Sequence, residues 1–325
     1  MSGMTPPEPP PAETPPAPTG NESYRLFDRA LLARRRARSA AALPDSDFLL
    51  AEAAEGLAGR LAPVVRDFPL ALDLGAHDGR LGRAALKTAK IGTLISGESC
   101  SKFLQALPDP RIACDEEILP IRDESLDLVL SGLSLQWVND LPGALIQIRR
   151  ALKPDGLFLA ALAGGDTLNE LRSALIEAES EITGGVSPRV APFVEIRDAG
   201  GLLQRAGFAL PVADADTLTV RYRNPFRLLQ DLRNMGWSNA LIDRSRRPMR
   251  RDVLFRAMEI YAEKFSDPDG RARATFEIVY LSGWAPHESQ QQPLRPGSAR
   301  MRLADALGTA ENPAGEKAGG DTGRE

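Results

Sequence analysis

Short apolar runs alternate with helix-like segments through the middle of the chain. The apolar runs cover residues 69–74, 91–97, 111–114, 125–131 and 157–163, and the segments between them repeat apolar residues at helical spacing over 80–90, 99–107 and 141–152. An apolar run of this length between turn residues is typical of a strand that is buried on both faces. Strands that alternate with helices predict an α/β fold with a doubly wound, mostly parallel, Rossmann-like sheet.

The flanking segments predict helices around this sheet and two further strands. Residues 1–21 are rich in proline and predict a disordered tail, and 22–68 predict N-terminal helices, the second of them capped by Asp45 or Ser46. The remaining divisions are a sheet core over 69–165, a helical cap with one strand at 217–222 over 166–270, a closing strand with a C-terminal segment over 271–306, and a disordered tail over 307–325.

The overall composition excludes several classes of protein. A formal net charge of −4 gives no indication of a nucleic-acid partner. Cys100 and Cys114 form neither a Cys-x-x-Cys pair nor a second cluster, which predicts two buried thiols and no metal site. No apolar run is long enough to span a bilayer, and the N-terminus lacks the features of a signal peptide. We therefore expect a cytoplasmic protein.

Residues 23–41 combine apolar residues with several arginines and predict an amphipathic basic helix. Phe27, Leu31 and Arg34 fall on one face of that helix. Two interpretations remain open. The helix makes peripheral contact with an anionic membrane surface or an acidic partner, or it is an ordinary docking helix with a solvated basic face.

A glycine turn joins the first predicted strand to the helix that follows it. Asp73, Gly75 and Gly79 stand in this segment, and such glycines let a ligand approach the backbone near a helix N-terminus. Their spacing departs from the Gly-x-Gly-x-x-Gly fingerprint of dinucleotide-binding proteins. It resembles the first motif, Asp-x-Gly-x-Gly-x-Gly, of class I S-adenosylmethionine-dependent methyltransferases, with His77 in place of the middle glycine.

Further motifs extend this resemblance. An acidic turn that ends in Leu-Pro covers 115–120, a Leu-Asp-Leu-Val strand covers 126–129, and a Leu-Lys-Pro-Asp-Gly turn covers 152–156. In this order and at these spacings, the motifs are similar to the successive motifs of the class I methyltransferases. The resemblance implies S-adenosylmethionine as the cofactor.

The resemblance also implies which residues hold the cofactor. The glycine turn, with Asp73, Gly75, His77 and Gly79, would hold the amino-acid end, and Glu98, after the second strand, would hold the ribose. The acidic turn, with Asp115 and Glu116, would meet the adenine, and Ser131, at the end of the fourth strand, would lie beside the methyl group. A carboxylate accepts two hydrogen bonds at once, which suits the two ribose hydroxyls. The His77 side chain would either tilt away from the cofactor or crowd it.

Longer matches indicate one family within this superfamily. Residues 26–31, 133–142, 164–168, 185–189, 235–239 and 284–289 resemble the arginine hydroxylase family of mitochondrial complex I assembly factors and its alphaproteobacterial relatives. The resemblance covers about 24–306 and implies a protein substrate, an iron–sulfur subunit of respiratory complex I, that is methylated or hydroxylated on arginine. The malonyl-acyl carrier protein O-methyltransferase of biotin synthesis is a more distant likeness. A non-catalytic chaperone that binds the cofactor is a third alternative.

Position alone suggests the residues that face the substrate. Gln136 and Trp137 follow the fourth strand beside the expected methyl group, although a core position suits Trp137 as well. Asp166 and Glu170 stand one helical turn apart, where they are placed to receive a guanidinium or simply to start a helix with favourable acids.

The histidine content bears on hydroxylation. A non-haem iron site commonly takes two histidines and a carboxylate. The chain has only two histidines, His77 and His287, and the first of them lies in the glycine turn. The sequence therefore predicts no conventional iron site and supplies no mechanism for hydroxylation.

Overall fold

The computed structural model describes residues 25–291, 305 and 308–309. Residues 25–287 belong to one compact unit, and the described residues from Glu288 onward belong to a second. The tail predicted over 1–21 lies outside the described residues, as does the tail over 307–325 apart from residues 308 and 309. No helix in the described part of the chain is both long and apolar enough to cross a membrane.

Seven strands form one sheet in the order β3-β2-β1-β4-β5-β7-β6. Their bounds are β1 Phe68–Leu74, β2 Ile91–Glu98, β3 Arg111–Ala113, β4 Leu126–Gly132, β5 Leu152–Ala163, β6 Ala209–Tyr222 and β7 Ala272–Trp284. Only β7 runs antiparallel to its neighbours, so the predicted doubly wound, mostly parallel sheet is confirmed. The strand order reverses between β1 and β4, and ligands of such sheets bind at the carboxyl ends of the strands beside this point.

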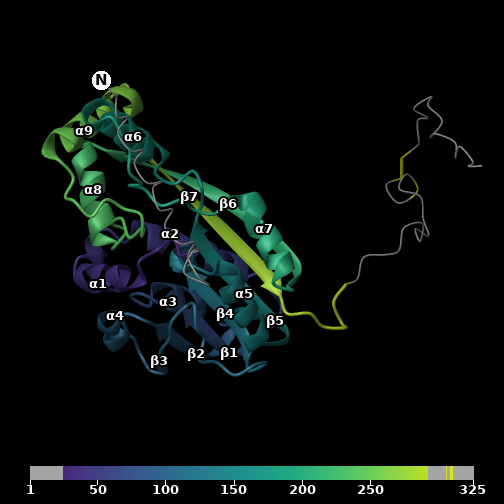
Figure 1. The fold of residues 1–325 in the computed structure, drawn as a ribbon. Helices are drawn as coiled ribbons and strands as arrows, with labels where there is room; N and C mark the ends of the chain where they lie inside the picture. The colour runs from purple at the N-terminus through teal and green to yellow at the C-terminus, as the bar shows by residue number, and fades with distance from the viewer. Residues whose placement is uncertain (1–24, 292–304, 306–307, 310–325) are drawn as a thin grey trace, which may run out of the picture. The chain divides into compact units, whose positions relative to one another are not determined.

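Helices cover both faces of the sheet (Figure 1). They are α1 Arg29–Ser39, α2 Phe48–Leu61, α3 Arg80–Leu86, α4 Ser101–Ala106, α5 Leu141–Ala151, α6 Asn169–Thr183, α7 Ile196–Arg205, α8 Pro225–Asn234 and α9 Arg251–Phe265, with 3-10 turns η2 Leu43–Asp45 and η3 Leu135–Trp137. Helices α2, α3, α6 and α9 share one apolar core with the sheet, and α5 and α7 share the other. Ala71 of β1 packs into the first core and Leu72 into the second, which explains why this strand is apolar on both faces up to Asp73.

The N-terminal helices begin later than their sequence predicts. Asp28 caps α1 by accepting a hydrogen bond from the Leu31 amide at 2.9 Å, so Phe27 lies outside the helix and forms a β-bridge with Leu241. The predicted cap of α2 at Asp45 or Ser46 is wrong, because residues 43–45 form the separate turn η2 and α2 begins at Phe48.

Gly56 of α2 packs against Tyr280 of β7. A Cβ added there would lie 2.2 Å from the Tyr280 hydroxyl oxygen and 2.6 Å from its Cζ, and the Arg60 guanidinium covers the buried ring at 3.5 Å. We expect Gly56→Ala to lower the free energy of unfolding by about 2 kcal/mol, as overpacking a core does. Gly59→Ala, where a Cβ meets no atom within 4 Å, should instead raise it by about 0.5–1 kcal/mol through helix propensity. Urea unfolding measures both changes, and equal effects would contradict this packing.

Candidate functional site

The turn between β1 and α3 has a left-handed backbone at three positions. The φ angles of Gly75, His77 and Gly79 are 71°, 50° and 75°. A Cβ at Gly75 would lie 2.0 Å from Ser134 Oγ, so this position requires glycine. Histidine enters the left-handed region more readily than branched residues do. The His77 ring packs edge-on against Phe103, with 6.1 Å between the ring centroids, so the turn forms without the middle glycine.

Asp73 carries a fully buried carboxylate near the carboxyl end of β1. Within the described residues, neither of its oxygens has a hydrogen-bond partner of normal geometry. Burial raises the pKa of Asp73 to about 7, although the nearby Gly82 amide favours the charged form. A buried carboxylate without partners is unfavourable, so this one is suited to a cationic donor that a ligand brings.

Glu98 is the last residue of β2, and its carboxylate is also fully buried. Its Oε1 accepts from the Cys100 amide at 2.7 Å, and its Oε2 accepts from the His77 amide at 2.8 Å. Arg36 Nη2, from α1, lies 3.0 Å from both oxygens. The acid predicted for the ribose therefore lies at the expected end of its strand, with an arginine bound to it.

Glu116 is the third fully buried carboxylate. Its Oε1 accepts from Ser134 Oγ at 2.5 Å and from Arg36 Nη1 at 3.3 Å, and its Oε2 accepts from Arg29 Nη2 at 2.9 Å. Burial alone would raise the pKa of Glu116, but Arg36 and Arg29 outweigh burial and hold it at about 2. The half-exposed Asp115 also binds Arg29 Nη2, at 2.5 Å. Two arginines of α1 thus neutralise the acids predicted to meet the adenine.

Arg36 also joins His77 to this cluster. Arg36 Nη2 lies 3.1 Å from His77 Nδ1, and because a guanidinium only donates, the imidazole nitrogen accepts. Burial and the charge of Arg36 lower the pKa of His77 to about 3, so the ring is neutral near pH 7. Burial opposes the charge of Arg36 as well, but Glu98 and Glu116 outweigh it and raise the arginine's pKa. The site therefore holds a charged guanidinium between two carboxylates and a neutral ring.

The candidates near the end of β4 make internal hydrogen bonds. Ser131 Oγ donates to the Leu74 carbonyl at 2.8 Å and so ties β4 to β1. Gln136 Nε2 donates to the Leu133 carbonyl at 2.8 Å, whereas its Oε1 is buried without a partner among the described residues. In this conformation the Ser131 hydroxyl links two strands of the sheet, and the Gln136 Oε1 is available to accept a hydrogen bond from a ligand.

Asp166 and Glu170 differ in their surroundings. The buried Glu170 carboxylate accepts from the Thr275 amide at 3.1 Å and from the Thr275 hydroxyl at 2.5 Å, which ties α6 to β7. In this conformation Glu170 is paired with Thr275, and its binding of a substrate guanidinium stays a prediction. Asp166 is exposed just before α6 and stays a prediction. Among residues 25–291, 305 and 308–309, no group of three or more His, Cys, Asp or Glu side chains is arranged to hold a metal ion.

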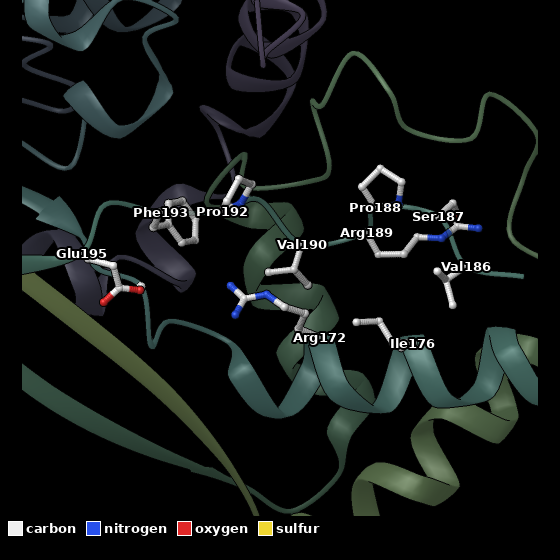
Figure 2. Close-up of a pocket in the computed structure, with 11 residues that line it drawn as sticks. Arg172, Ile176, Val186, Ser187, Pro188, Arg189, Val190, Pro192, Phe193 and Glu195 are labelled. Carbon is white, nitrogen blue, oxygen red and sulfur yellow. The ribbon is translucent and has the colours of Figure 1, made fainter. Parts of the chain in front are cut away.

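Two cavities lie beside a cluster of three aromatic rings, in which Trp137 packs edge-on against Phe193 and Trp237. The first, of about 300 Å³, is lined by these three rings and by apolar residues of α6, α8 and α9. The second, of about 490 Å³, lies between α6 and residues 186–195, and Phe193 lines both. In Figure 2 the Arg172 side chain of α6 points toward the end of the second cavity where Phe193 and Glu195 lie.

The sequence prediction missed the partners of the buried acids. Arg29, Leu32 and Arg36 recur on one face of α1 at helical spacing, which is the signal that places two arginines together. Arg29 and Arg36 bind the acids, and Arg35 donates to the Asn239 carbonyl.

This arrangement also bears on the predicted membrane contact of 23–41. The helix covers only Arg29–Ser39, and three of its arginines have internal partners. Arg34 and Arg38 remain exposed on α1. The basic surface that α1 offers to a membrane is therefore smaller than its composition suggests.

The residue types of the cradle, meaning the turn of 75–79 with its three buried acids, fit S-adenosylmethionine. Asp73 suits the ammonium group, Glu98 suits the ribose hydroxyls, and the acidic turn suits the adenine amine. When bound, this cofactor supplies an activated methyl group on a cationic sulfur. In the conformation described, however, the cavity between Arg36, His77 and Trp237 is only about 10 Å³, whereas pockets for drug-sized ligands measure roughly 300–1,000 Å³.

Sequence comparison agrees with this geometry. Residues 72–160 match the methyltransferase-domain family. The mitochondrial arginine-hydroxylase NDUFAF5 of Homo sapiens is 40% identical over 314 residues, which cover 93% of this chain and 90% of the human protein. The protein of the same name from Danio rerio is 38% identical, with 88% and 91% covered. The malonyl-[acyl-carrier protein] O-methyltransferase of Halorhodospira halophila is 34% identical, with 85% and 94% covered.

Solved structures share the fold. The YcgJ protein of Bacillus subtilis has a TM-score of 0.50 and 14% identity, and the match covers 72% of this chain and 98% of that one. A likeness at this identity shows the fold alone. The sequence matches go further, because they span nearly the whole of both chains and include the strands and turns that form the cradle. The chain belongs to the S-adenosylmethionine-dependent methyltransferase superfamily and, within it, to the family of the arginine-hydroxylase NDUFAF5.

Proposed function

We propose that this protein binds S-adenosylmethionine and modifies an arginine side chain of a protein substrate, either by hydroxylation, with molecular oxygen and an external reductant as co-reactants, or by methylation from the cofactor. The observation that carries the proposal is the 40% identity with an arginine hydroxylase across nine tenths of that protein. The cradle supports cofactor binding, because three buried carboxylates and a glycine turn meet at the carboxyl ends of neighbouring strands. By resemblance, the substrate is an iron–sulfur subunit of respiratory complex I, reached in the cytoplasm at the inner face of the membrane.

The two cavities beside the cluster of three aromatic rings give the substrate a place to bind. Their combined walls offer aromatic rings from Trp137, Phe193 and Trp237, and the exposed carboxylate of Glu195 lies at one end (Figure 2). A guanidinium forms charge-assisted hydrogen bonds with a carboxylate and also stacks on aromatic rings. Arg172 and Arg189 also line the second cavity, but Arg172 donates to the Thr167 and Ala191 carbonyls and Arg189 binds Glu179. Because these two arginines already have partners, the rings and Glu195 favour an arginine side chain, on an extended segment of a partner protein, as the occupant.

Mass spectrometry of the iron–sulfur subunit tests the proposal. The subunit from wild-type cells should carry one additional oxygen on an arginine, and the subunit from a deletion strain should lack it. Complementation with Gly75→Asp should not restore the oxygen, because a side chain at Gly75 collides with Ser134. An added methylene in place of the oxygen would indicate methylation, and an unchanged subunit in both strains would refute this substrate.

The malonyl-acyl carrier protein O-methyltransferase is the alternative, favoured by 34% identity over 94% of the Halorhodospira halophila enzyme. Rescue of a strain that lacks this enzyme on biotin-free medium would support the alternative, and failure despite good expression would count against it. Normal complex I assembly by a Gly75→Asp, Glu98→Ala double variant that binds no cofactor would indicate a chaperone instead of an enzyme.

A further inference from the structure

Helix α1 carries a buried arginine into the cradle. Arg36 is only 6% exposed, and its guanidinium bridges Glu98 and Glu116. Its Nε is also buried and has no partner among the described residues, so the guanidinium is held from its two terminal nitrogens alone. Figure 1 shows α1 beside α4, next to the strands whose ends form the cradle.

The hydrogen bonds of Glu98 leave no room for a second ligand. A carboxylate offers about four lone-pair sites. The Cys100 and His77 amides take one on each oxygen. Arg36 Nη2 lies 3.0 Å from both oxygens, so the hydrogen that it does not direct to His77 Nδ1 is shared between them. The two amides belong to the loops that position Glu98. A ribose that places its two hydroxyls on the two Glu98 oxygens needs the position that Nη2 occupies, and it must therefore replace Arg36.

The attachment of α1 is mainly polar. Of the residues that the helix buries, Arg36 and Ser39 are polar and only Leu32 is apolar. The N-terminal end is held separately, since the Phe27 amide donates to Asn139 Oδ1 at 2.7 Å. With few buried apolar contacts, the C-terminal half of α1 is held to the cradle mainly by the ion pairs of Arg36 with Glu98 and Glu116, so a ligand that replaces these pairs can release it.

We propose that Arg36 is a displaceable latch that holds the cradle closed. The cofactor opens this latch by taking the place of Arg36 on Glu98. The proposal rests on the use of S-adenosylmethionine by this site and adds how access to the site is controlled. The C-terminal half of α1 moves away as the ion pairs break, which enlarges the cavity of about 10 Å³ between Arg36, His77 and Trp237. The apparent affinity for the cofactor is then the intrinsic affinity multiplied by the open fraction.

Titration calorimetry with S-adenosylhomocysteine as the probe tests the latch. Arg36→Gln removes the charge that holds Glu98 and Glu116, so the open fraction rises and binding should tighten about tenfold. Arg34→Gln removes the same charge from an exposed position of the same helix and should leave the affinity unchanged. Arg36→Lys keeps the charge but offers one nitrogen in place of the two that bind Glu98 and Glu116, so its affinity should fall between those of the wild type and Arg36→Gln.

Hydrogen exchange on the wild-type protein provides a readout that requires no variant. On addition of S-adenosylhomocysteine, the amides of residues 33–39 should exchange faster, whereas those of the turn at 75–79 should exchange more slowly. Slower exchange of 33–39, or binding by Arg36→Gln that is no tighter than that of Arg34→Gln, would overturn the latch and leave the cofactor assignment intact. Absence of binding to every form would refute the cofactor assignment and the latch with it.

Discussion

Glu98→Gln is expected to weaken the binding of S-adenosylhomocysteine by about 30-fold. Hydrogen bonds to a charged group contribute roughly 1.5–3 kcal/mol each, and the substitution removes the charge that two ribose hydroxyls would share. The same substitution also weakens the interaction of Arg36 with residue 98, so the open fraction rises and part of the lost binding free energy is recovered. The net expected loss is about 2 kcal/mol, and a factor of ten corresponds to about 1.4 kcal/mol.

Calorimetric titration at constant pH measures this change. Glu55→Gln is the matched control, because Glu55 is exposed on α2 and the substitution changes the net charge equally. In the Glu98→Gln background, Arg36→Gln should tighten binding by much less than in the wild type, because residues that share an interaction do not contribute additively. If Glu98→Gln did not weaken binding in the Arg36→Gln background, where no latch remains to be released, Glu98 would not belong to the binding site.

The strands of the central sheet were predictable because their burial leaves a local pattern. β1 and β4 are apolar at almost every position, and both faces of each are buried. β6 was only half predicted, from residue 217, although it begins at Ala209. It is the edge strand of the sheet, and its first residues alternate with Asp214 and Asp216 in a pattern that also suits an exposed loop.

The acids of the candidate site were predictable, but their partners were not. Asp73, Glu98 and Glu116 stand at fixed places relative to strand ends, and a motif records such places. Arg36 lies 62 residues from Glu98 and 80 from Glu116, so only the packing of α1 brings them together. Glu170 shows the same limit. The sequence did not show that Glu170 of α6 lies beside β7, where its carboxylate accepts hydrogen bonds from Thr275.

Asp73→Asn should make the cofactor-free protein more stable at pH 8. Burial raises the pKa of the Asp73 carboxyl from 3.8 to about 7, so between these values the folded protein keeps a proton that the unfolded chain has released. Stability is therefore lost as the pH rises from about 4 to 7, and the loss is complete above pH 7. The difference between a pKa of 3.8 and one of about 7 corresponds to about 4 kcal/mol, which is the upper bound on the gain in the free energy of unfolding from an uncharged side chain of equal size. For Asp73→Asn we expect a gain of roughly 2–4 kcal/mol.

Urea unfolding at pH 5.5 and pH 8 measures this gain, which should be larger at pH 8. Asp127→Asn is the matched control on the neighbouring strand. Asp127 is also buried, but it accepts from the Leu70 amide and from Lys153 Nζ, both at 3.0 Å, so the same substitution there should lower stability. A gain for Asp73→Asn that does not depend on pH would show that ionisation of Asp73 is not the cause.

The same substitution should weaken cofactor binding about tenfold to 100-fold, because the ionised Asp73 carboxylate is the partner that the cradle offers to the ligand's ammonium group. Wild-type affinity for S-adenosylhomocysteine should also rise as the pH passes through about 7, where Asp73 ionises, and the variant should lose that rise. Calorimetry from pH 6 to pH 8 measures both effects. If Asp73→Asn raises the free energy of unfolding but weakens cofactor binding, the Asp73 carboxylate lowers stability and serves the ligand, as residues of functional sites often do. If the variant kept the wild-type affinity and pH dependence, the ammonium group would have to bind elsewhere in the cradle.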